Sequence, residues 1–343
     1  MVSSASRFLT GTKLRLAYFT GFARLMARRR GGAGVILRFE RVRPPRAARF
    51  QPLKSREISP QFLDRVIRAL KRWKLDIVSM DEACRRAADP SSKRRFVCLT
   101  FDGGAKDLMI SAYPVLSRHG VPFTVYIPTA FPDGLGEAWW LALQAVIARN
   151  DQIALFMDSR ERRFRVAGIS EKYQLYDFLH DWLRALPPPD LSVAINDLCT
   201  RYSVDLAAIS RDSAMSWDDL SKLSADPLVT IGSATLHYPI LTTIKNVDAQ
   251  KEIAMGRAVA QAAFHRDIRH FAYPFGGRED YDRKHAAMAA DSGFASAVSA
   301  VPGVVHRGGR SNLHELPRIS WDGRQRSLLV MRVMLSGMML EDS

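Results

Sequence analysis

The stretch FVCLTFDGG (96–104) decides the fold, because it is an unbroken apolar run that ends in an aspartate and two glycines. Such a run is typical of a strand that is buried on both faces of a parallel sheet. Asp102 is therefore expected at the carboxyl end of a strand, where parallel α/β proteins place their chemistry. Two other stretches have the same construction, IGSATLHYP (231–239) and FAYPFG (271–276).

Around these stretches, short apolar runs alternate with segments of helical periodicity. The predicted strands lie at 34–42, 75–80, 95–102, 122–129, 228–235, 270–276, 294–300 and 315–321. Strands that alternate with helices indicate a parallel α/β architecture, and about eight of them favour a barrel. The alternation breaks between about 133 and 214. The Trp139-Trp140 pair and LHDWLRAL (179–186) predict that this segment is a helical insertion covering one end of the domain.

The composition, 47% hydrophobic and 25% charged, is that of an ordinary globular protein. No apolar run reaches the roughly 18 residues of a membrane-spanning helix. The three cysteines, Cys84, Cys98 and Cys199, form no CxxC pair, which excludes a cysteine-based zinc site and favours a reducing compartment. We therefore expect a cytoplasmic protein. Motifs of dinucleotide-binding proteins, P-loop proteins, serine hydrolases and HExxH metalloproteases are absent from the sequence.

The net charge of +15 is concentrated at the start of the chain, where eight basic residues precede the first acid, Glu40. We interpret 1–33 as a basic helical extension and 34–337 as the folded domain. Three roles for the extension remain open: a solvated helix face, attraction to an anionic membrane surface, or an organelle-targeting segment. No specific nucleic-acid partner is expected.

The three strand-end stretches, in this order, resemble the motifs of the NodB-type polysaccharide deacetylases, carbohydrate esterase family four, which include chitooligosaccharide deacetylases. The resemblance extends over about 34–337 and includes SWDDLSKLSADPLVTIGS (216–233) and LPRISWDG (316–323). It implies a single distorted (β/α) barrel of seven to eight parallel strands. It also implies hydrolysis of N-acetyl groups on amino sugars by water bound to zinc or another divalent metal.

When the motif positions of the family are matched to this sequence, the position of the base keeps its aspartate and the positions of the metal ligands carry other residues. The base falls on Asp102 and the metal aspartate on Gly103, while the two metal histidines fall on Ala234 and Tyr238. Glycine and alanine offer no donor atom, and a phenol with a pKa of about 10 replaces an imidazole poorly. We therefore expect no metal cofactor.

Asp107 and His237, with Asp102, are the nearest candidate ligands for a rebuilt metal site. The alternative is that Asp107, like Asp102, bonds to loop amides and that His237 lies on the surface. Both interpretations remain open from the sequence.

The third motif is kept as Pro274, Phe275 and Gly276, and the resemblance assigns the Phe275 N–H to the oxyanion and its neighbours to the substrate groove. Two positions depart from the family pattern. An arginine of that motif is Ala272 here, and a histidine at the end of the first strand is Glu40.

His314 is a weak candidate for the general acid, and an exposed loop histidine is the alternative. Trp139 and Trp140 suit stacking on sugar rings or packing in a core. Because adjacent helix residues point about 100° apart, only one of the two is expected to face a groove.

The sequence thus predicts a polysaccharide deacetylase-like protein of carbohydrate metabolism with impaired or lost metal-dependent activity. Its expected partner is an N-acetylated oligosaccharide or polysaccharide. The first alternative is a catalytically inactive saccharide-binding or regulatory protein. The second is a membrane-surface protein that acts through its basic amino-terminal helix.

Overall fold

The computed structural model describes residues 31–157 and 160–337, so the predicted basic extension lies almost entirely outside the described residues. The centre of the fold is an all-parallel sheet in the order β11–β10–β9–β6–β5–β1–β12, with β4 beside β5. Its strands are β1 (Gly34–Phe39), β4 (Asp76–Val78), β5 (Phe96–Asp102), β6 (Phe123–Ile127), β9 (Val229–Ser233), β10 (His270–Ala272), β11 (Ser296–Val298) and β12 (Ile319–Ser320). All eight predicted strands are present at the predicted places.

The sheet curls until its two outer strands approach each other. The chain just before β12 bonds to the end of β11, with Leu316 N donating to Ala297 O at 3.0 Å and Arg318 N to Val301 O at 3.0 Å. β12 then pairs with β1 on its other side. The predicted distorted (β/α) barrel is thereby confirmed, and the parallel strands bring their carboxyl ends to one mouth of it.

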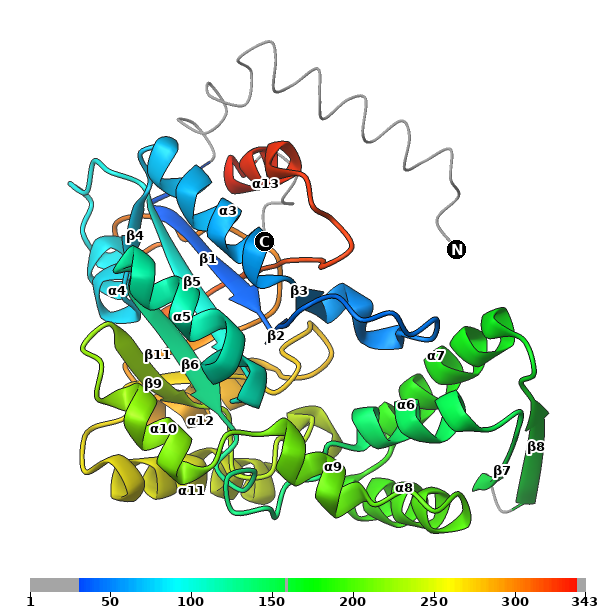
Figure 1. The fold of residues 1–343 in the computed structure, drawn as a ribbon. Coiled ribbons are helices and arrows are strands. Elements are labelled where there is room, and N and C mark those ends of the chain that lie inside the picture. Colours follow the sequence, from blue (N-terminus) through cyan, green and yellow to red (C-terminus); the bar gives the residue numbers. More distant parts are fainter. Residues whose placement is uncertain (1–30, 158–159, 338–343) are drawn as a thin grey trace.

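Helices cover the outside of the barrel (Figure 1). They are α3 (Pro60–Arg72), α4 (Met80–Ala88), α5 (Tyr113–His119), α10 (Trp217–Ser224), α11 (Asn246–Phe264), α12 (Arg283–Asp291) and α13 (Leu328–Leu335). Their starts follow local capping chemistry: Ser59 Oγ accepts from Phe62 N, and Ser216 with Asp219 forms a capping box at the start of α10. Within the described residues, no helix is long and apolar enough to cross a membrane.

The segment between β6 and α10 forms an insertion at the mouth of the barrel, drawn in green in Figure 1. It consists of α6 (Trp139–Arg149), β7 (Gln152–Met157), β8 (Arg160–Arg165), α7 (Ile169–Ala185), α8 (Pro188–Arg201) and α9 (Leu206–Ser213). The sequence predicted helices here and missed the antiparallel β7–β8 hairpin. Strand β7 buries Ile153, Leu155 and Met157 in a core that the insertion shares with its helices.

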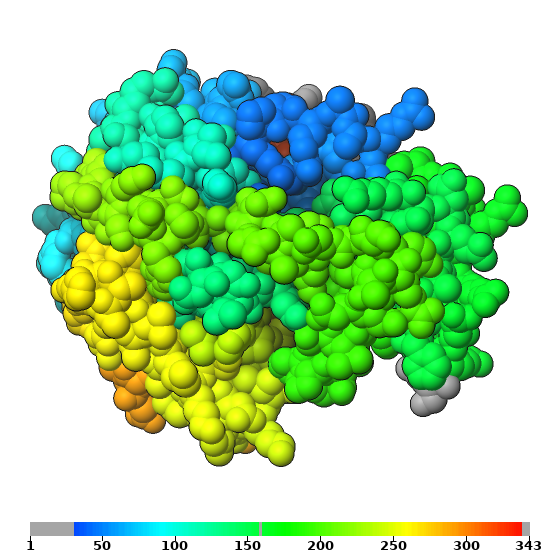
Figure 2. All heavy atoms as spheres, turned by 60° about the horizontal axis from the view of Figure 1, so that its bottom comes forward, coloured from blue at the N-terminus to red at the C-terminus, as the bar shows by residue number. Residues whose placement is uncertain are grey.

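The chain between β1 and α3 lies against this insertion. It contains β2 (Arg41–Val42), the short helix η1 (Pro52–Arg56) and β3 (Glu57–Ile58). Gln51 N donates to the Tyr173 hydroxyl of α7 at 2.9 Å, and the Phe50 ring packs edge-on against Tyr173. Figure 2 shows this blue segment in contact with the green insertion, so the two together cover the mouth of the barrel.

Candidate functional site

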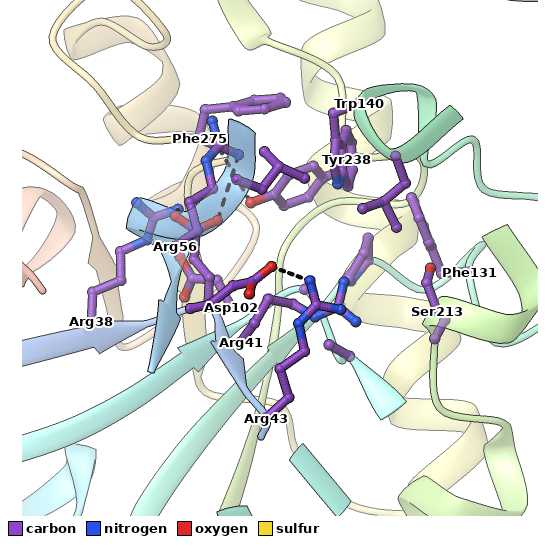
Figure 3. A pocket seen from close by; sticks show the side chains of 18 residues that line it. Arg38, Arg41, Arg43, Arg56, Asp102, Phe131, Trp140, Ser213, Tyr238 and Phe275 are labelled. Carbon is purple, nitrogen blue, oxygen red and sulfur yellow. Dashed lines mark hydrogen bonds and ion pairs between the residues drawn. The ribbon is translucent and has the colours of Figure 1, made fainter. Parts of the chain in front are cut away.

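Three strand ends meet in one pocket at the mouth of the barrel (Figure 3). Asp102 ends β5, Tyr238 follows β9, and Phe275 follows β10, and all three line the same pocket together with Gly103. The structure therefore brings together the strand ends that carry the resemblance.

Asp102 is held by two arginines. Its Oδ2 receives Arg38 Nε at 2.5 Å and Arg318 Nη2 at 2.8 Å, while its Oδ1 receives Arg318 Nη1 at 2.6 Å. Arg318 is completely buried and also donates to Ser299 O at 2.6 Å. Burial acts to raise the pKa of the Asp102 carboxyl, but the two guanidinium groups outweigh burial and hold the pKa below its usual range. A carboxylate in this state is a weak base, and both of its oxygens already accept hydrogen bonds.

Sequence reasoning missed Arg38 and Arg318, although each offered a signal. Arg38 interrupts the apolar strand GVILRF, and Arg318 lies between Leu316 and the buried Ile319. Long charged side chains are almost never fully buried unless they are paired. A charged residue inside a run that reads as a buried strand therefore predicts a buried partner of opposite charge.

The vacated metal positions provide no ligand set. Gly103 has no side chain, and Ala234 is fully buried with only a methyl group. Burial raises the pKa of the Tyr238 phenol to about 12, so the phenol remains protonated at neutral pH. The residues present therefore do not fit the divalent metal of the family. Among residues 31–157 and 160–337, no three His, Cys, Asp or Glu side chains are grouped so as to hold a metal ion.

The two predicted substitute ligands point to other partners. Asp107 accepts from Arg41 Nε at 2.5 Å. His237 lies with its side chain 52% exposed, and its Nδ1 lies 2.7 Å from Glu252 Oε1. That hydrogen bond raises the pKa of His237. His314 bonds to a backbone carbonyl and does not line the pocket around Asp102.

The Phe275 N–H, which the resemblance assigns to the oxyanion, donates to the Tyr238 hydroxyl over 3.4 Å. The two rings lie 5.2 Å apart, and Trp140 of the insertion packs 6.1 Å from Tyr238 and 6.0 Å from Phe275. Trp139 is buried beside them. We call Trp140, Tyr238 and Phe275 the aromatic wall, and it closes one side of the pocket.

Four arginines also line the pocket, and Figure 3 shows Arg38, Arg41, Arg43 and Arg56 around Asp102 and the aromatic wall. They are balanced by acids: Glu40 pairs with Arg38 at 3.3 Å and with Arg56 at 3.5 Å, and the buried Glu57 pairs with Arg43. The remaining cavity measures about 60 Å³. The base position is thus enclosed by a network of ion pairs.

The backbone of the mouth has an unusual conformation at three non-glycine residues. Thr235, Tyr238 and Phe275 have φ values of 67°, 68° and 59°, in the left-handed region. Such conformations cost about 1–3 kcal/mol each and cluster at functional sites. Two of the three lie in the aromatic wall, so the loops have the backbone features of a functional site although the metal-ligand side chains are replaced.

Comparison with known proteins shows what this chain is similar to. The family model for polysaccharide deacetylases matches residues 194–297. The structure is similar to the deacetylase PplD of Streptococcus pyogenes in complex with acetate, with 13% identity, a TM-score of 0.57, and coverage of 88% of this chain and 97% of that one. For IcaB of Ammonifex degensii the corresponding values are 15%, 0.56, 88% and 98%. No curated protein matches this chain. The family match, which spans the second and third strand-end stretches, and the shared fold confirm the resemblance to polysaccharide deacetylases.

Proposed function

We propose that this polysaccharide deacetylase-like protein binds an N-acetylated saccharide and does not hydrolyse it by the metal-dependent route. One observation carries the loss of hydrolysis: Asp102, the base position, forms three short hydrogen bonds to Arg38 and Arg318 inside the protein. Deacetylation needs a carboxylate that can accept a proton from water. Two fixed guanidinium groups oppose protonation of this carboxylate.

The other two requirements of the reaction are also unmet. No residue at position 103, 234 or 238 can supply the expected metal ligand. The Phe275 N–H faces the Tyr238 hydroxyl instead of an open space for an oxyanion. The base and the oxyanion donor are retained but engaged by other partners, and the metal ligands are replaced, which favours lost activity over altered activity.

Saccharide binding is supported by the aromatic residues that the insertion brings to the mouth of the barrel. Trp140 is half-buried and lies against the Tyr238 and Phe275 rings. Aromatic side chains supply large contact areas at binding sites. The solved relative from Streptococcus pyogenes is a deacetylase in complex with acetate, and by analogy we assign an N-acetylated ligand to this chain.

Two measurements on the purified protein test the proposal. Calorimetric titration should detect no stoichiometric zinc binding, and chitin oligomers should yield no acetate with or without a chelator. The same oligomers should raise the melting temperature, because a ligand that binds only the native state stabilises it. Tight one-to-one zinc binding, or acetate release at an enzymatic rate, would contradict the proposal. A melting temperature unchanged by millimolar oligomer would show that the protein does not bind this ligand.

A further inference from the structure

A second cavity lies between the insertion and the barrel, on the other side of the aromatic wall. It measures about 260 Å³, against about 60 Å³ for the pocket at Asp102. Trp140, Tyr238 and Phe275 line both cavities and so separate them. The remaining walls come from both the insertion and the barrel and include Glu137, Trp139, Arg184, Ser192, His237 and Ile240.

The polar groups of this cavity are held in place by partners outside it. Arg184 pairs with the buried Asp280 of the barrel, which also fixes the insertion, and its guanidinium lies 4.8 Å from the centre of the Phe275 ring. His237 is oriented by Glu252. Groups whose positions are fixed in advance lose little entropy when they bind a ligand.

Glu137 is also fixed, by two residues of α8. Its Oε1 accepts from Ser192 Oγ at 2.9 Å and from Asn196 Nδ2 at 3.0 Å. Within the described residues, neither Glu137 Oε2 nor Nε2 of His237 has a hydrogen-bond partner. The cavity therefore offers an oriented carboxylate oxygen and a ring nitrogen beside aromatic surfaces.

We propose that this cavity, and not the pocket at Asp102, is the saccharide-binding site, and that it takes one pyranose residue. The inference rests on the proposed function and adds the location of the ligand. The volume is close to the lower end of the roughly 300–1,000 Å³ of small-molecule sites, which suits one sugar unit. Aromatic walls match the apolar C–H faces of a pyranose, and the polar groups match its hydroxyls.

The charges of the cavity argue against other ligands. A lipid chain would cover Glu137 Oε2 and His237 Nε2 without giving either atom a polar partner, and burying polar atoms unpaired is costly. An anionic ligand would meet the Glu137 carboxylate. A neutral polyhydroxyl ring satisfies donors and acceptors together.

Two substitutions test the location. Ser192→Phe places a ring in the proposed cavity from α8 and also removes the hydrogen bond to Glu137, whereas Ser213→Phe places the same ring in the pocket at Asp102 from α9; both serines are half-buried. We expect Ser192→Phe to weaken binding of chitobiose at least about tenfold, which corresponds to about 1.4 kcal/mol, in calorimetric titration. Ser213→Phe should change the Kd less than about twofold, since it leaves the cavity unfilled. Glu137→Gln, which keeps the side-chain shape, should also weaken binding and serves if Ser192→Phe does not fold.

The outcomes separate the two proposals. If Ser213→Phe weakens binding and neither cavity variant does, the saccharide occupies the Asp102 pocket and this inference is wrong while the proposed function stands. If the wild-type protein binds neither chitobiose nor N-acetylglucosamine, the proposed function fails and the inference fails with it.

Discussion

Replacement of Asp102 by alanine is the sharpest test of the ion-pair network at the mouth of the barrel. In a metal-dependent enzyme, loss of the base would mainly abolish catalysis. In this chain it leaves the guanidinium groups of Arg38 and Arg318 without the carboxylate that neutralises them. The side chains of these two arginines are only 9% and 0% exposed, so both charges would stay buried. We therefore expect Asp102→Ala to act on folding stability.

The magnitude follows from the geometry. Removing one partner of a buried ion pair costs about 3–5 kcal/mol, because the other charge stays buried without compensation. Asp102 serves two cations through three hydrogen bonds of 2.5–2.8 Å, so we expect a loss near the upper end, about 5 kcal/mol. Most domains have only about 5–15 kcal/mol in total, so the variant should be close to unfolded at 37 °C.

Asp107→Ala is the matched control, because Asp107 also accepts a 2.5 Å bond from an arginine but lies in a less buried position. Urea unfolding followed by circular dichroism gives both free energies. We expect the control to lose about 1 kcal/mol, as for pairs nearer the surface. A loss below about 1 kcal/mol for Asp102→Ala would refute the idea that this carboxylate holds the barrel mouth together.

The same ion pairs predict a pH dependence. The folded pKa of Asp102 is lower than that of an unfolded aspartate, which is about 3.9. Its contribution to stability is therefore fully present above about pH 4 and is lost as the pH falls through the folded pKa. The wild-type protein should lose stability in that acid range, and Asp102→Asn should lose less there. An unchanged acid profile in Asp102→Asn would show that this group is not responsible.

Three further results are expected. Tyr238→Phe removes the acceptor of the Phe275 N–H and should cost about 1 kcal/mol in urea unfolding; a neutral effect would mean that the 3.4 Å contact contributes nothing. Arg184→Ala should cost about 2 kcal/mol and speed hydrogen exchange in α6–α8, because it removes an ion pair between the insertion and the barrel; unchanged exchange would contradict that role. The combined variant Gly103→Asp, Ala234→His, Tyr238→His should bind zinc in calorimetry where the wild type does not, and equal titrations would overturn the assignment of the vacated positions.

The barrel was predictable because its signals are local and repeated. Each buried parallel strand is a short apolar run, and the turns and caps between the runs have specific chemistry, as at Ser59-Pro60 and Ser216. The hairpin in the insertion had no such signal. Strand β8, RERRFR, has four arginines in six residues, and Arg and Glu are not strand-favouring residues. Its formation depends on the apolar face of β7, which is a tertiary effect.

For the site, the sequence predicted which motif residues are replaced, but it did not predict the contacts that the remaining residues make. The motif positions located Asp102, Gly103 and Tyr238 at strand ends, and the substitutions there could be read directly. The pairing of Asp102 with Arg318 could not be predicted. The two residues lie 216 positions apart, and the pair forms only when β12 closes the barrel. The bond from Phe275 N to the Tyr238 hydroxyl likewise depends on two loop conformations with left-handed backbones.

These contacts indicate that restoring the metal ligands is not enough to restore the enzyme. Gly103 has a φ of 91°, so aspartate there would be strained, although the space around its Cβ is open. More importantly, the variant with all three ligands would still hold Asp102 between Arg38 and Arg318, and its carboxylate would remain a weak base. We therefore expect this variant to bind zinc and yet release little acetate from chitin oligomers. Full activity in the variant would show that the arginine pair does not prevent Asp102 from acting as a base.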